Sequence, residues 1–191
     1  MVTKTETLLT AEEFMARLGE FWPAELIGGR VVRISEEEWR MANGGKHGTI
    51  RSNIDVLICE YLKTNRLGRV FQETGTRTRR DPDQVRFPDV CFFGQDRLEK
   101  LGIPEGNFPE APDLAIEVVS PSDRWNEVMG KVAEYLAAET RVVWVVTPKN
   151  RNVTVFHKDG RVEIRTSKDV LNGEPVLPGL EIPVAEIFEG I

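Results

Sequence analysis

Two acidic residues stand where buried strands would normally carry aliphatic side chains. Glu117 lies inside Leu114–Val119 (LAIEVV), and Asp89 lies inside Phe87–Phe93 (FPDVCFF). An ionised carboxylate in such a setting is costly unless solvent or a cation reaches it. Two carboxylates on strands of one sheet can converge on a hard cation, because their oxygens are its natural ligands. Either acid alone could be an edge residue or a salt-bridge partner, but the presence of two favours a functional site.

A lysine is the third candidate for this chemistry. On a helical projection, Lys131 falls between Val128 and Tyr135, at the margin of the stripe expected to pack on the sheet. The alternative is a lysine that buries its aliphatic stem and extends its amine to water. Tyr135 lies one turn later and is expected to pack beside Lys131 and fix its rotamer rather than take part in chemistry.

Two further polar residues lie at predicted element ends. His47 begins a long amphipathic helix, where it could contact phosphate, because a helix N-terminus attracts anions; it could equally be a capping-region residue. Ser120 follows the strand that carries Glu117 and either supports the site through a hydrogen bond or caps the turn into the next helix.

The charge distribution bears on any nucleic-acid partner. The 191 residues include 25 Lys+Arg and 31 Asp+Glu, for a net charge of −6, which argues against bulk electrostatic coating of nucleic acid. Residues 169–191 carry five acids and no base, whereas residues 63–86 carry seven bases against three acids. We therefore expect a phosphate backbone to meet one predicted hairpin, through Arg77, Arg79, Arg80 and Arg86. The alternative is a solvated hairpin edge that charge keeps soluble.

Composition indicates a single soluble domain over residues 1–191, with a core large enough to need no disulfide or structural metal. Cys59 and Cys91 lie in apolar runs and are expected to be core residues in a reducing compartment. The N-terminus lacks a signal-peptide pattern, and no apolar stretch approaches the roughly 20 residues of a membrane span. We therefore expect a cytoplasmic protein that does not engage a membrane.

The elements that must position these residues follow from hydrophobic periodicity. Helical spacing predicts a short helix over residues 11–18, a helix of four or five turns that starts after Asn43-Gly44-Gly45, and a helix after residue 124. Alternating or continuous apolar runs predict strands at 113–120 and 141–146, and hairpins at 26–34, at 69–78 with 85–93, and at 153–157 with 161–166. This order favours an α+β domain with one central sheet.

Several motifs occur in a familiar order along the chain. They are ELIGG at 25–29, His47-Gly48, FPDV at 87–90, PDLAIEVVSPSDR at 112–124, Lys131 with Tyr135, and VWVV at 143–146. This series resembles the Uma-type restriction endonuclease family, part of the PD-(D/E)XK nuclease superfamily, over about residues 20–190. The IEVVSPSDR stretch followed by the Lys and Tyr four apart is its most specific part.

The resemblance implies a restriction-endonuclease-like core, in which a central mixed β-sheet is flanked by helices and additional β-hairpins. It implies that Asp89 and Glu117 bind the metal. The superfamily places a lysine two positions after the second acid, but here that position is Val119, and Lys131 is the matching lysine from the following helix. Glu25 matches the acid of the first motif and is either an additional ligand or base, or a hairpin salt-bridge partner.

The expected activity is Mg²⁺-dependent hydrolysis of phosphodiester bonds in DNA, with Mn²⁺ able to substitute and no organic cofactor. No Gly-rich phosphate loop, G-x-S-x-G elbow or Cys/His pair supports a small-molecule enzyme. A homodimer is expected by fold analogy alone. The alternative is a catalytically silent protein of the same fold that binds nucleic acid or a protein partner, which Val119 and the acidic net charge favour.

Overall fold

The computed structural model describes residues 8–42 and 44–191, so Asn43 and the first seven residues of the predicted domain lie outside the described residues. The described helices are α1 (Ala11–Ala16), α2 (Leu18–Phe21), α3 (Glu36–Ala42), α4 (Gly45–Thr64), α5 (Gln95–Leu101), α6 (Trp125–Ala137) and α7 (Val184–Ile187), with a 3₁₀ turn, η1 (Pro148–Asn150). The described strands are β1 (Ala24–Ile27), β2 (Arg30–Arg33), β3 (Gly68–Gln72), β4 (Thr76–Arg79), β5 (Gln84–Arg86), β6 (Val90–Gly94), β7 (Leu114–Val118), β8 (Val142–Thr147), β9 (Asn152–His157), β10 (Val162–Thr166), β11 (Val170–Asn172) and β12 (Glu181–Pro183).

The centre of the molecule is a six-stranded mixed sheet in the order β10-β9-β8-β7-β6-β3. Strands β7 and β8 are parallel, and every other neighbouring pair is antiparallel. The parallel pair requires a crossover, which α6 supplies. The expected α+β class with a central mixed sheet is confirmed, and β9 and β10, predicted as a separate hairpin, extend this sheet.

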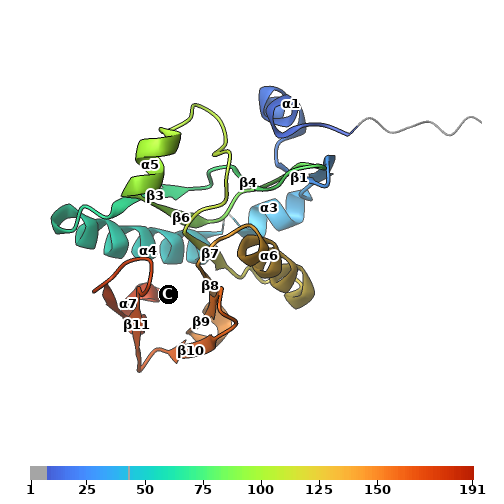
Figure 1. Ribbon diagram of the computed structural model, residues 1–191. Helices are drawn as coiled ribbons and strands as arrows, with labels where there is room; N and C mark the ends of the chain where they lie inside the picture. Colours follow the sequence, from blue (N-terminus) through green and yellow to red (C-terminus); the bar gives the residue numbers. More distant parts are fainter. Residues whose placement is uncertain (1–7, 43) are drawn as a thin grey trace, which may run out of the picture.

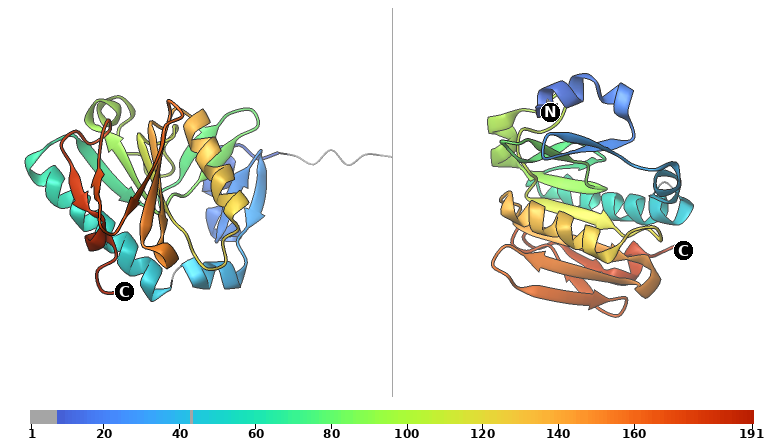
Figure 2. Two further views of the ribbon diagram at one scale, coloured as in Figure 1. Left: turned by 90° about the horizontal axis from the view of Figure 1, so that it is seen from below. Right: turned by 90° about the vertical axis from the view of Figure 1, so that its right-hand side faces the viewer.

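Helices cover both faces of the central sheet (Figure 1), and the left view of Figure 2 shows strands between α4 and α6. Side chains alternate along β7, so Leu114, Ile116 and Val118 join the core on the α4 face. Ala115 packs instead with the α6 residues Val128 and Val132 on the other face. Glu117 has the parity of Ala115, so the strand presents its carboxylate toward α6.

The hairpin predicted from residues 69–78 and 85–93 is divided between two sheets. Its inner part, β4 and β5, joins the β1-β2 hairpin in a four-stranded sheet of order β2-β1-β5-β4. Its outer part, β3 and β6, pairs within the central sheet. Pro88 interrupts the second run because it lacks an N–H for a continuous ladder. This division leaves Asp89 at the junction of the two sheets, immediately before β6.

The two ends of the described chain also differ from simple expectation. The capping box of Thr10 and Glu13 starts α1 as predicted, but that helix ends at Ala16 and α2 begins after Arg17. The acidic segment 169–191 is part of the core, because its apolar residues are buried on the α4 face of the central sheet. They are Leu171, Leu177, Leu180, Ile182, Val184, Ile187 and Phe188.

Among the residues that the structure describes, no helix is long and apolar enough to cross a membrane.

Candidate active site

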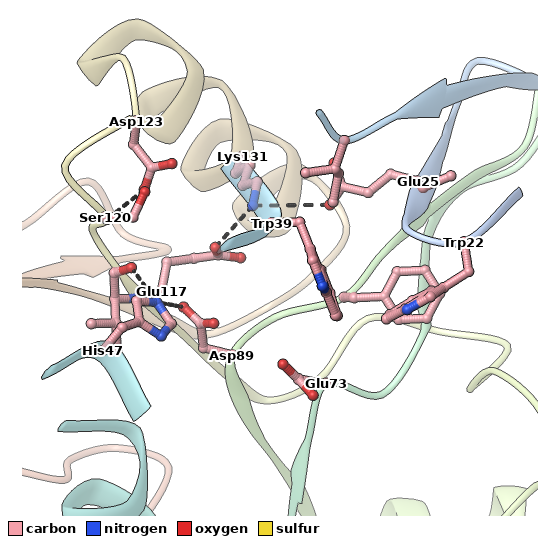
Figure 3. Close-up of a pocket in the computed structure, with 14 residues that line it drawn as sticks. Trp22, Glu25, Trp39, His47, Glu73, Asp89, Glu117, Ser120, Asp123 and Lys131 are labelled. Atoms are coloured by element: carbon pink, nitrogen blue, oxygen red, sulfur yellow. Dashed lines mark hydrogen bonds and ion pairs between the residues drawn. The ribbon is translucent and has the colours of Figure 1, made fainter. Parts of the chain in front are cut away.

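Glu117 lies on β7 and meets two side chains from α6. Its Oε2 accepts a hydrogen bond from Lys131 Nζ at 3.0 Å, and its Oε1 accepts one from Tyr135 Oη at 2.9 Å. Lys131 and Tyr135 are four residues apart, so they lie on one face of the helix. Figure 3 shows the Lys131 amine directed at the Glu117 carboxylate. The lysine therefore reaches the acid from the helix rather than from the strand.

Sheet register brings Asp89 to the same place. The ladder between β6 and β7 pairs Val90 with Ile116, so Asp89 and Glu117 are the next residues on the two strands. Asp89 Oδ2 accepts a hydrogen bond from the Val118 N–H at 2.7 Å, which fixes the carboxylate at the end of β7. Asp89, immediately before β6, thus lies next to Glu117 of the neighbouring strand β7.

His47 contacts this junction from the first turn of α4. Its Nε2 lies 2.9 Å from the Val118 carbonyl oxygen and 3.4 Å from Asp89 Oδ2. Both neighbours are acceptors, so Nε2 carries the proton and donates it to the carbonyl. The His47 side chain is buried and its Nδ1 has no partner among the described residues. The histidine therefore supports Asp89 and β7, which goes beyond a capping role.

A cavity of about 110 Å³ opens where these residues meet (Figure 3). Its ionisable lining consists of Glu25, His47, Glu73, Asp89, Glu117, Asp123 and Lys131. Five carboxylates thus surround one lysine and one histidine, so the cavity favours cations. Its remaining wall is largely apolar.

Burial raises the pKa of Glu117, and repulsion from Asp89 and Glu25 adds to this effect against the attraction of Lys131. Burial alone would lower the pKa of Lys131, but Glu117, Glu25 and Asp89 outweigh it and raise that pKa. The lysine is thus held as an ammonium ion. Since its side chain is 29% exposed, it also remains open to a ligand in the cavity.

These donors suit a hard divalent cation. The side-chain donors of Asp89 and Glu117 are carboxylate oxygens, and a cation beside Glu117 would offset the repulsion that disfavours its ionised form. Within residues 8–42 and 44–191, no group of three or more His, Cys, Asp or Glu side chains is arranged to hold a metal ion. Two carboxylates nevertheless match Mg²⁺, which keeps several waters and takes one or two protein carboxylates.

Comparison with known proteins identifies the family and a similar fold. The model of the Uma2 family, described as "Putative restriction endonuclease", matches residues 12–185. The chain belongs to the Uma2 family. The chain also resembles the crystal structure of "a putative nuclease belonging to DUF820" from Anabaena variabilis ATCC 29413, with a TM-score of 0.76 and 24% identity over 94% of this chain and 97% of that one. No curated protein sequence matches the chain.

Glu25, Tyr135 and Ser120, the other predicted site residues of this Uma2 protein, make contacts near Glu117 and Lys131 or at the start of α6. Glu25 forms an ion pair with Arg86 of the neighbouring strand β5, and its Oε1 also lies 3.9 Å from Lys131 Nζ. Its role as a ligand or base stays a prediction. The Tyr135 hydroxyl donates a hydrogen bond to Glu117, and the fixing of the Lys131 rotamer by Tyr135 stays a prediction. The Ser120 N–H donates to Asp123 Oδ2 at 2.7 Å, and this contact closes the turn that precedes α6.

The four arginines predicted to contact phosphate separate into two pairs. Arg77 is buried and forms ion pairs with Glu12 and Asp83. Arg86 is buried between Glu25 and Glu134. Both guanidinium groups are buried and form ion pairs with carboxylates of this chain. This corrects the assignment of Arg77 and Arg86 to a phosphate-binding surface.

Arg79 and Arg80 are the exposed pair. They donate hydrogen bonds to the carbonyl oxygens of Pro82 and Pro109, respectively. Their contact with phosphate therefore remains a prediction.

Sequence reasoning missed several residues that line the cavity of this Uma2 protein. Trp22 and Trp39 form part of its apolar wall, and Glu73 lies at its edge. Glu73 has a positive φ of 45° and forms an ion pair with Arg51 of α4. A non-glycine residue with positive φ is strained, and such residues cluster at functional sites. No sequence motif marks these positions, because the tertiary fold alone brings them to the cavity.

The environment of His47 predicts a pH-dependent contribution to stability. Burial by itself would lower its pKa, but the hydrogen bond and charge of Asp89 outweigh burial, so the pKa is raised above 6.5. A group with a raised folded-state pKa contributes stability below the unfolded value and loses it as pH rises through the folded value. We expect the free energy of unfolding of wild type, relative to His47→Gln, to be greater at pH 5.5 than at pH 8.5.

Urea unfolding at the two pH values measures this difference, with Lys46→Gln on the exposed side of the same turn as the control. A difference between wild type and His47→Gln that stays constant or grows toward pH 8.5 would contradict the assigned role of Asp89.

Proposed function

We propose that this Uma2 protein is an Mg²⁺-dependent endonuclease that hydrolyses phosphodiester bonds in DNA, with Mn²⁺ able to replace Mg²⁺. The observation that carries the proposal is the 3.0 Å contact of Lys131 Nζ with Glu117 Oε2, in the cavity that Asp89 also lines. An acid pair and a lysine are the groups that the PD-(D/E)XK resemblance implies. Lys131 supplies from α6 the amine that Val119 does not.

Asp89 and Glu117 would hold the metal ion, whose chemistry when bound is to activate water and neutralise phosphate charge. The Val118 N–H holds Asp89 in place, and Tyr135 orients Glu117. Lys131 remains an ammonium ion and is partly exposed, so it can orient the attacking water or stabilise negative charge on the phosphate. Metal binding and charge stabilisation in this scheme require neither Arg79 nor Arg80.

Plasmid cleavage tests the proposal. We expect the purified protein to convert supercoiled DNA to nicked and linear forms with Mg²⁺ or Mn²⁺, and to leave it intact in EDTA. Gel electrophoresis over a time course measures the products, and linear DNA gives a second substrate. Cleavage that persists in EDTA would contradict the metal mechanism. Binding of DNA without cleavage in both metals would instead support a silent protein of this fold.

A further inference from the structure

An aromatic corner lies across the cavity from Glu117, Asp89 and Lys131 (Figure 3). It consists of Trp22, Trp39 and Phe87, all of which line the cavity that holds Glu117, Asp89 and Lys131. The centroid of the Trp22 ring lies 5.3 Å from that of Trp39 and 5.6 Å from that of Phe87, and both pairs are edge to face. Figure 3 shows the two tryptophans facing the site across the cavity.

Within the aromatic corner, Trp22 is exposed to solvent and Trp39 and Phe87 are half-buried. Trp22 is 39% exposed, whereas large aromatic residues such as Trp144 and Phe14 are fully buried in the described core. In an edge-to-face pair, the ring that contributes its edge keeps both faces clear of its partner. A partly exposed indole ring therefore lines the same cavity as the carboxylates.

We propose that the aromatic corner is a nucleobase-stacking subsite, and that the substrate presents an unpaired base beside the scissile phosphate. This inference rests on the proposed function and specifies its substrate class. Bases stack on aromatic side chains without sequence preference, and each stacked base contributes about 1–3 kcal/mol. The carboxylates and the indole rings line one cavity, so a base stacked on the rings would lie beside a phosphate held near Lys131.

An intact duplex does not offer such a base. Each base inside a duplex is stacked between its neighbours, so an indole ring can reach it only after the base is unstacked or flipped out. Single-stranded DNA presents its bases without that cost. The charge of the site supports the same choice, because the cavity has one lysine and two of the four predicted arginines are buried in ion pairs. The cavity itself therefore offers few cations to hold a rigid duplex by its phosphates.

A second cavity continues the path of such a strand. It has a volume of about 470 Å³ and shares Trp22, Glu73 and Phe87 with the first cavity. Phe71 and the exposed Ile103 lie farther along it. Trp22 and Phe87 of the aromatic corner thus lie where two cavities adjoin, so a flexible strand that passes Trp22 would place one nucleotide near Lys131 and its neighbour in the second cavity.

Equilibrium binding tests the subsite independently of cleavage. The probes are a 12-nucleotide oligo(dT) and an abasic strand of the same length, and the host is the Glu117→Gln variant with Mg²⁺, so that neither strand is cut. We expect Trp22→Ala in this host to weaken oligo(dT) binding about 5- to 150-fold, which corresponds to the loss of one stacked base. Binding of the abasic strand should change little, and Trp22→Phe should restore most of the affinity for oligo(dT).

Trp125→Ala is the matched control, because Trp125 is 51% exposed and does not line the cavity. An equal loss for both probes, or no loss with Trp22→Ala, would overturn the stacking subsite. If base-dependent binding is seen but the wild type cuts no DNA, the nuclease proposal fails and the subsite stands. If the wild type cuts duplex and single strands equally well, with no effect of Trp22→Ala, the subsite fails and the nuclease proposal stands.

Discussion

Replacing Glu117 by glutamine is expected to reduce Mg²⁺-dependent cleavage by about 100-fold or more. Loss of a residue that merely supports a metal ligand commonly costs 10- to 100-fold, so loss of a ligand should cost at least the upper end of that range. The amide keeps the shape of the side chain but has only one oxygen and no charge. Initial rates of plasmid nicking at saturating Mg²⁺ measure the effect.

The same substitution is expected to leave the protein at least as stable as wild type. The pKa of Glu117 is raised by burial and by Asp89 and Glu25, even against the attraction of Lys131, so its ionised form is disfavoured in the folded state. This cost is absent at low pH, where the carboxyl is protonated, and is complete once pH exceeds the raised folded-state pKa. Glutamine cannot ionise, so it removes this cost of a buried charge. Such a gain is expected where a functional residue is retained at the expense of stability.

Glu60→Gln is the matched control, because Glu60 is exposed on α4 and does not line the cavity. We expect it to alter neither nicking nor the urea midpoint appreciably. If Glu117→Gln unfolded the protein, the loss of activity would carry no information about metal binding. If Glu117→Gln were stable and fully active, Glu117 would not be a metal ligand.

Replacing Arg86 by methionine is expected to destabilise the protein by about 3–5 kcal/mol, the usual cost of removing one partner from a buried ion pair. Arg86 donates to Glu25 and makes two hydrogen bonds to Glu134, at 2.7 and 2.9 Å. The Glu25 side chain is only 12% exposed, so it would be left as a buried carboxylate without its principal cation. Urea unfolding at pH 7 measures the change.

Arg79→Met serves as the control, because Arg79 is exposed and its side chain donates one hydrogen bond to Pro82. We expect a change of less than about 1 kcal/mol there. Adding Glu25→Leu to Arg86→Met should recover part of the lost stability, because the unpaired carboxylate is then gone. Similar losses in the two arginine variants would show that Arg86 does not hold a buried ion pair.

Local periodicity in the sequence was sufficient for the elements that carry the central site. The apolar run around Glu117 predicted β7, and the helical spacing of Val128, Val132 and Tyr135 predicted α6. Alternation along a strand and the repeat of a helix are local properties, so they can be read without knowledge of distant segments. The same patterns made Glu117 and Lys131 conspicuous, because each places a charge at or beside an apolar face.

Only the tertiary structure decided which charged residues face the cavity and which pair internally. Arg86 meets Glu25 across 61 positions and Glu134 across 48, and Arg77 meets Glu12 across 65. Such pairings depend on how the two sheets and α6 pack, which no local pattern encodes. The division of the central hairpin and the approach of Trp22 and Trp39 to Glu117 have the same origin, because side chains from separate elements meet only when the core assembles.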